Sequence, residues 1–130
     1  MDNFNITFSM TSNGQTQTYK ATELKKSKEM YRISFPSADD SKNSYSITIV
    51  NKSKIVFACS GMISYNFTLE RGKTSRFIIN MLNSPVECEV FCENLSVNLF
   101  GDKINLSGKY KLDVGGNVNI YRFTLGGNLC

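Results

Sequence analysis

Few side chains in this 130-residue sequence could perform catalysis, because it contains no histidine. Without an imidazole the protein can form neither a serine triad nor a Cys–His dyad. Three carboxylates, Glu87, Glu89 and Glu93, share one face of an expected strand, where the first two would lie about 6.6 Å apart. Acid–base or metal chemistry would need a converging partner such as Asp102 or Asp113, and the spacing instead fits a solvent-facing row. We therefore expect a protein that is not an enzyme.

Cysteine is the other residue type that could react or bind a metal, and the chain has four. Cys88 and Cys92 would lie about 13 Å apart along a strand, too far for a disulfide or a shared zinc ion. No second close pair completes a four-cysteine site. We expect no metal, no cofactor, and buried structural thiols at Cys59, Cys88 and Cys92. Cys130 is expected to be exposed.

The charge distribution favours neither nucleic acid nor membrane as a partner. The chain has fifteen Lys and Arg residues and eleven Asp and Glu residues, which gives a net charge of +4. The basic residues are scattered along the sequence rather than gathered on one face. The densest group, Lys25, Lys26 and Lys28, falls where we expect a hairpin tip. The first residues show neither a basic nor an apolar stretch, so we expect no secretion signal, and no apolar run is long enough to span a membrane. We expect a cytoplasmic location, where thiols stay reduced.

The elements that we expect to position any site are strands, because hydrophobic residues recur mainly at every second position of the sequence. Along 104–114, isoleucine, leucine, glycine, tyrosine and valine alternate with asparagine, serine, lysine and aspartate, a pattern typical of a half-buried strand. Turn residues such as Asn13 and Gly14 separate these runs. The pattern predicts strands at 4–11, 15–24, 29–35, 44–50, 54–60, 62–71, 73–81, 86–100, 103–114 and 118–125. The strand at 86–100 is long enough to be bent near Asn94.

Short connections between these strands favour a meander of antiparallel neighbours. A twisted sheet of this size tends to curl and close, so that no edge remains exposed. We therefore predict an all-β fold in one domain over 1–130, a single up-and-down antiparallel β-barrel of about eight to ten strands. A β-sandwich is the alternative, but only the segment 36–44 is long enough for a crossing connection.

Three segments together resemble the YwiB-like family, small bacterial β-barrel proteins with a domain of unknown function. Segment 65–73 (YNFTLERGK) resembles that family's strand ending in E-x-G-K, and 93–99 (ENLSVNL) its k-x-L-x-V-x-L strand. Segment 104–117 resembles its long alternating strand and penultimate hairpin. Between 83 and 85 the chain has Asn-Ser-Pro where the family has a Thr-Pro-aromatic-Gly turn. The resemblance implies a calycin-like, lipocalin-shaped barrel in a cytoplasmic bacterial protein, and it implies no enzyme activity.

A barrel of this size can enclose one small ligand or fill itself with side chains. Arg122 is the first candidate ligand residue, because its strand is apolar on both faces and a guanidinium in the lumen could bind a carboxylate or phosphate. The alternative places it on the outer surface. Arg76 is a second candidate, although Phe77 and Ile79 compete for the inner face. Tyr65 and Tyr110 are expected to point inward, where each phenol needs a partner.

The function that these residues favour is non-enzymatic binding of a small apolar or amphipathic ligand in the lumen. The alternative is a protein–protein interaction module, a packed barrel without an internal ligand, acting as a monomer or a homodimer. In that case Phe91 and Ile78, apolar residues expected on the outer face, would form the contact surface. Large inward rings favour a filled interior, whereas Gly108 leaves a gap in it.

Overall fold

The computed structural model describes residues 4–28, 30–35, 43–81 and 84–129, which form eleven strands and no helix. No helix in this part of the chain could therefore cross a membrane. The strands are β1 (Asn5–Ser12), β2 (Gln15–Lys20), β3 (Glu23–Ser27), β4 (Met30–Phe35), β5 (Ser44–Asn51), β6 (Lys54–Ser60), β7 (Ile63–Glu70), β8 (Thr74–Met81), β9 (Ser84–Phe100), β10 (Lys103–Val114) and β11 (Asn117–Asn128). The prediction of an all-β chain is confirmed.

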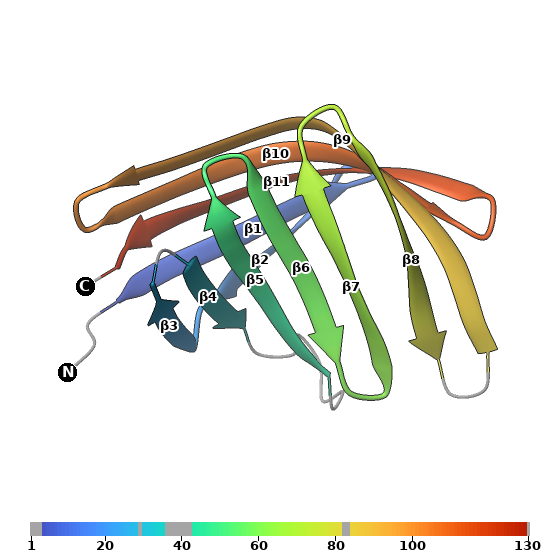
Figure 1. Ribbon diagram of the computed structural model, residues 1–130, viewed down its shortest axis with the longest axis horizontal. Helices are drawn as coiled ribbons and strands as arrows, with labels where there is room; N and C mark the ends of the chain where they lie inside the picture. Colours follow the sequence, from blue (N-terminus) through green and yellow to red (C-terminus); the bar gives the residue numbers. More distant parts are fainter. Residues whose placement is uncertain (1–3, 29, 36–42, 82–83, 130) are drawn as a thin grey trace.

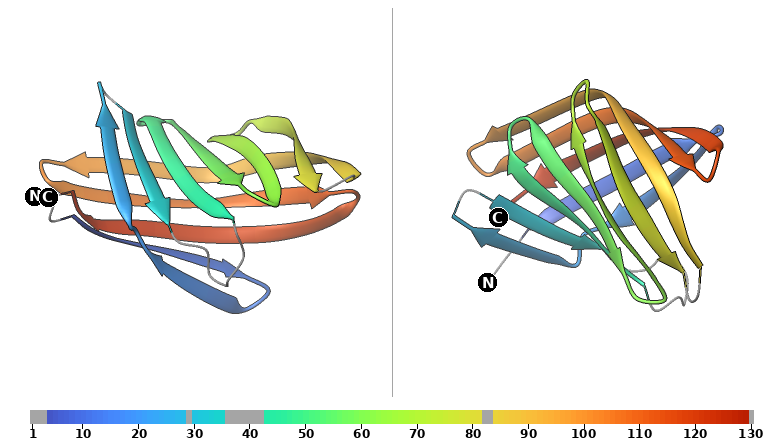
Figure 2. Two further views of the ribbon diagram at one scale, coloured as in Figure 1. Left: turned by 90° about the horizontal axis from the view of Figure 1, so that it is seen from below. Right: turned by 45° about the vertical axis from the view of Figure 1, so that its right-hand side comes forward.

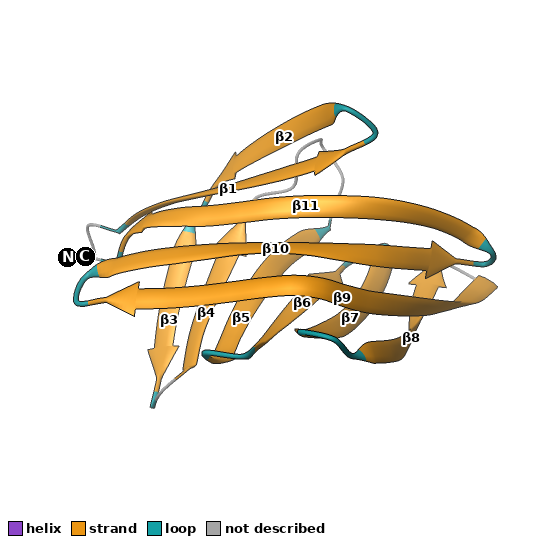
Figure 3. Cartoon of the chain, turned by 90° about the horizontal axis from the view of Figure 1, so that it is seen from above, coloured by secondary structure: helices purple, strands orange, loops and turns teal. Residues whose placement is uncertain are grey.

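These strands form one antiparallel sheet that curls into a half-barrel. Its strand order is β2-β1-β11-β10-β9-β8-β7-β6-β5-β4-β3, so consecutive strands from β3 to β11 lie side by side, and β11 also pairs with β1. Figure 1 shows the long strands β9 to β11, with β1 and β2, as one layer. The shorter strands β3 to β8 cross it as a second layer (Figures 2 and 3). The hydrophobic core lies between the two layers.

The predicted closed barrel of about eight to ten strands is wrong in strand number and in closure. The expected strand at 15–24 is divided at Ala21 and Thr22 into β2 and β3, which occupy opposite ends of the strand order. The amide of Ala21 donates to the Ile6 carbonyl in β1 over 2.9 Å, whereas the amide of Thr22 donates to the Ser34 carbonyl in β4 over 2.8 Å. The chain therefore passes from one edge to the other here, and no ladder joins β2 to β3 within the described residues.

The bend expected near Asn94 is a β-bulge at Glu93. Asn94 pairs with Lys109 and Cys92 with Tyr110, so Glu93 is the extra residue in β9. Its carboxylate lies 3.1 Å from the Lys109 ammonium and 3.3 Å from that of Lys111. Hydrogen bonds from these two lysines lower the pKa of Glu93 below its usual value. The bulge bends β9, which pairs with β10 on both sides of it and with β8 over the residues from Ser84 to Phe91.

The inner face carries the residues that alternation predicted. Ile104 and Leu106 of β10 and Leu125 of β11 are almost completely buried. Cys59, Cys88 and Cys92 are buried free thiols, as expected. Cys130 lies outside the described residues.

Candidate ligand cavity

An aromatic cavity of about 320 Å³ lies between the two layers of the sheet. This volume is at the lower end of the range for small-molecule sites. Ten aromatic rings line it: Phe8, Tyr19, Phe35, Tyr45, Phe57, Tyr65, Phe67, Phe77, Tyr110 and Tyr121. They come from both layers, so that only the curled sheet brings them together.

Phe57 of β6 lies at the centre of an aromatic wall that it forms with Phe8, Phe67, Tyr110 and Phe123. Its ring centroid lies 5.2 Å from those of Phe67 and Phe123, 5.8 Å from that of Tyr110 and 6.0 Å from that of Phe8. Tilted and edge-to-face pairs at these distances are favourable beyond simple burial. These contacts pack the Phe57 ring tightly among its neighbours beside the cavity.

Two tyrosines of the cavity lining, Tyr45 and Tyr65, flank a buried thiol. Tyr45 of β5 pairs directly with Cys59 of β6, which pairs with Tyr65 of β7. Hydrogen bonds with both phenols act on the Cys59 thiol, but burial outweighs them and raises its pKa. Burial also raises the pKa of Tyr65 well above its usual value, with a further contribution from Cys59 and Tyr45. The raised pKa values keep the Cys59 thiol and the Tyr65 phenol uncharged near neutral pH. Cys59 donates its hydrogen to the Ile63 carbonyl over 3.4 Å, whereas Tyr45 and Tyr65 line the cavity, where a phenol can hydrogen-bond to a polar atom of a ligand.

Charged side chains are absent from the described lining of this cavity, which contains no Asp, Glu, Lys or Arg. An ion buried there would lose its hydration without gaining a counter-ion, at a cost of several kcal/mol. The chemistry of the lining is thus suited to an uncharged, flat or apolar group.

Of the predicted ligand residues, Arg122 does not line the cavity. Its side chain is exposed on the outer face of β11, because Tyr121, Phe123 and Leu125 occupy the inward positions of that strand. The apolar residues that share its face, Val118 and Ile120, are themselves about half exposed, at 58% and 45%. The placement in the lumen is therefore wrong, and the alternative on the outer surface is correct.

Arg76 is also exposed, on the outer face of β8, where its Nε lies 2.9 Å from Oε1 of Glu89. Tyr65 and Tyr110 do line the cavity, as predicted. The Tyr110 hydroxyl lies 3.8 Å from the Met10 sulfur, which is a weak acceptor.

Sequence reasoning missed three cavity tyrosines. Tyr45 lies on the same face of its strand as the buried Ile47 and Ile49, and Tyr121 lies on the same face as Phe123. The alternation of side chains could therefore have predicted that both tyrosines point inward. Tyr19 stands among polar residues of β2, and no local signal marks it as inward.

The two apolar residues expected on the outer face are indeed exposed. Ile78 has 49% and Phe91 37% of its surface accessible.

In the described part of the chain, no group of three or more His, Cys, Asp or Glu residues is arranged to hold a metal ion.

Burial of Tyr110 predicts a loss of stability in alkaline solution. Burial raises the pKa of Tyr110 well above its usual value, whereas the unfolded tyrosine ionises near about pH 10. Above that pH the unfolded state releases a proton that the folded state retains, so stability falls as pH rises. We expect the melting temperature to fall less steeply above about pH 10 in Tyr110→Phe than in the parent protein. Equal slopes in thermal unfolding across this range would contradict the prediction.

Comparison with known proteins identifies the fold. No family model matches the chain, and no curated protein matches it. Among solved structures, the crystal structure of the ywiB protein from Bacillus subtilis is similar, with a TM-score of 0.72 and 13% sequence identity. The similarity covers 98% of this chain and 89% of that one. The resemblance to the YwiB-like family that the sequence indicated is thus confirmed at the level of the fold.

Proposed function

We propose that this protein binds one small, uncharged apolar or amphipathic molecule in the aromatic cavity, without catalysing a reaction on it. The observation that supports the proposal is the combination of ten lining rings with no charged side chain in a cavity of about 320 Å³. Aromatic rings give a flat ligand a large contact area on rigid groups. The role that we propose is that of a calycin-like or lipocalin-like carrier in the cytoplasm.

The polar atoms of the lining restrict the ligand further. Tyr45 and Tyr65 line the cavity with their phenols, and Tyr110 contributes a hydroxyl that lies 3.8 Å from the Met10 sulfur, a weak acceptor. A ligand with one carbonyl or hydroxyl group could hydrogen-bond there. We infer a molecule with a flat apolar body and few polar atoms.

A pair of matched naphthalene dyes tests this proposal. N-phenyl-1-naphthylamine is uncharged, and 8-anilino-1-naphthalenesulfonate has the same skeleton with a sulfonate. We expect the uncharged dye to bind saturably, with one dye per chain, and the sulfonated dye to bind at least about tenfold more weakly, because its charge would lack a counter-ion. Fluorescence titration measures both affinities.

Two tryptophan variants locate the bound dye. Leu112 lines the cavity, and in Leu112→Trp the indole should fill it and abolish binding. Ile120, on the neighbouring strand, is 45% exposed, so Ile120→Trp should bind like the parent protein. Thermal unfolding checks that both variants are folded. Absence of binding to the parent protein, or equal binding to all three proteins, would refute the proposal.

The outer face of β8 to β11 is the alternative functional surface. Phe91, Lys111 and Ile120 are consecutive cross-strand neighbours there, and both apolar members of this row are partly exposed. This favours an interaction module as the second candidate function. A parent protein that binds neither dye would leave this surface as the better candidate.

A further inference from the structure

The hairpin formed by β7 and β8 is split along most of its length. In these two fully described strands, ladder pairing is limited to Ile63 with Met81 and Ser64 with Asn80. The same register would place Asn66 opposite Ile78 and would continue to the turn, but no ladder pairs form there. By contrast, β8 pairs with β9 along its whole length. The backbone groups that face each other across the split are therefore not joined by a ladder.

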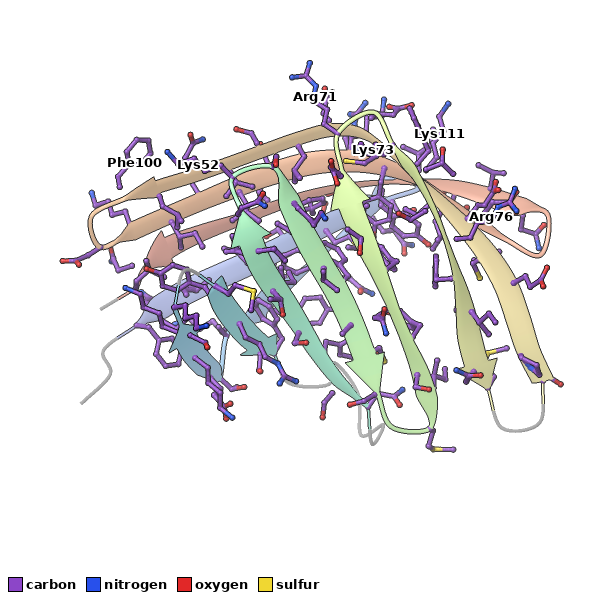
Figure 4. The ribbon with its side chains drawn as sticks, in the orientation of Figure 1. Lys52, Arg71, Lys73, Arg76, Phe100 and Lys111 are labelled. Carbon is purple, nitrogen blue, oxygen red and sulfur yellow. The ribbon has the colours of Figure 1, made fainter. Side chains whose placement is uncertain are left out.

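Contacts of the hairpin tip with β9 explain the split. The amide of Gly72 donates to the Cys92 carbonyl over 2.8 Å, and the amide of Cys92 donates to the Lys73 carbonyl over 3.1 Å. Figure 4 shows Arg71 and Lys73 at this tip and Arg76 further along β8. Because β8 follows the bent strand β9 while β7 stays paired with β6, the two halves of the sheet diverge between them.

A surface cleft of about 1,180 Å³ lies over the split. Its lining includes outward residues of both strands, such as Asn66 and Ile78, and inward residues of the same strands, such as Phe67 and Phe77. Side chains from opposite faces of a strand can line one cleft only where it extends between the strands. The cleft thus reaches from the outer surface into the sheet.

Three aromatic side chains separate this cleft from the aromatic cavity. Tyr65, Phe67 and Phe77 line both spaces. Their ring centroids lie 5.0 Å apart for Phe67 and Phe77, 6.0 Å for Tyr65 and Phe67, and 6.2 Å for Tyr65 and Phe77. Rotation of these rings or a small separation of β7 from β8 would connect the two spaces, without breaking a ladder along the split.

We propose that the ligand enters and leaves the cavity between β7 and β8, through a gate formed by Tyr65, Phe67 and Phe77. This inference rests on the proposed function. The competing route lies at the open edges of the sheet, where Gln17 and Tyr19 of β2 also line the cavity. Passage there would require no movement of the β7–β8 hairpin, so an experiment that locks this hairpin distinguishes the two routes.

An engineered disulfide across the split provides the lock. Asn66 and Ile78 are exposed and would be opposite each other in the continued register, so the double variant Asn66→Cys/Ile78→Cys can join β7 to β8. A Cys130→Ser background removes the terminal thiol. The control is Lys111→Cys/Ile120→Cys, which links directly paired residues on the adjacent strands β10 and β11.

Stopped-flow fluorescence with N-phenyl-1-naphthylamine measures the effect of the lock. We expect oxidation to lower the association rate at least about tenfold in the β7–β8 variant, and reduction to restore it. The control should bind at the parental rate in both states. An oxidised β7–β8 variant that binds as fast as its reduced form would overturn the proposed entrance, whereas failure of the parent protein to bind the dye would overturn the proposed function itself.

A second variant covers the case in which the disulfide does not form. Phe77→Ala removes one ring of the gate, and we expect its association and dissociation rates to rise together by about threefold or more. If Phe77 only lined the bound ligand, dissociation would accelerate at an unchanged association rate. That result would overturn the gate.

Discussion

Replacing Gly127 by alanine is expected to destabilise the protein by about 3–5 kcal/mol, the sum of backbone strain and a steric clash. Gly127 has a φ of +149°, a backbone conformation that residues other than glycine rarely adopt. An added Cβ would lie 1.9 Å from the carbonyl oxygen of Asn5. Since Gly127 pairs with the fully buried Ile6 on β1, the backbone of β1 has little freedom to move away.

The preceding glycine is a matched control for this prediction. A Cβ on Gly126 would make an ordinary contact of 3.8 Å with the Ile104 carbonyl oxygen. Gly126→Ala should therefore stay within about 1 kcal/mol of the parent protein. Urea unfolding of both variants measures the difference. Similar free energies of unfolding for the two would show that the pairing of β1 with β11 does not constrain Gly127.

Truncation of Phe57 is expected to have a comparably large effect. The ring contacts four other rings in the core, and only 7% of the residue is exposed. Phe57→Ala should cost about 3–5 kcal/mol through lost transfer energy and an unfilled cavity. The corresponding fall in melting temperature is about 10–20 °C.

The same substitution at an exposed phenylalanine provides the control. Phe100, at the end of β9, is 65% exposed, so Phe100→Ala should change the free energy of unfolding by no more than about 0.5 kcal/mol. Calorimetry of the two variants tests the comparison. If Phe57→Ala melted within a few degrees of Phe100→Ala, the aromatic wall would not be a rigid part of the core.

Local pattern was enough to predict most strands of this protein. The strand expected at 54–60 has those limits in the structure, and the one expected at 103–114 does too. Alternation with period two is a property of a single strand, so it can be recognised without knowing the neighbours. The bend in β9 was also predictable, because a strand of that length rarely stays straight against a curled sheet.

The direction of individual side chains was harder to predict where both faces of a strand are apolar. On β11, Val118 and Ile120 made the face of Arg122 look internal, but packing against β1 and β10 buries Phe123 and Leu125 instead. Tyr19 enters the cavity for a similar reason. Its strand carries no hydrophobic pattern, and its position follows from the pairing of β2 with β1.

By itself, the sequence determined the all-β class, most strand limits and the absence of histidine-dependent chemistry, because these depend on residue types and on a local period. The tertiary structure alone decided three other features: the division of the chain at Ala21 and Thr22, the grouping of ten rings around one cavity, and the split between β7 and β8. Each of these depends on which backbone groups pair across the sheet. The split shows this most clearly, because the segment from 63 to 81 has the sequence of an ordinary hairpin, whereas the pairing of β8 with β9 and the hydrogen bonds of Gly72 and Lys73 to Cys92 hold its tip on β9.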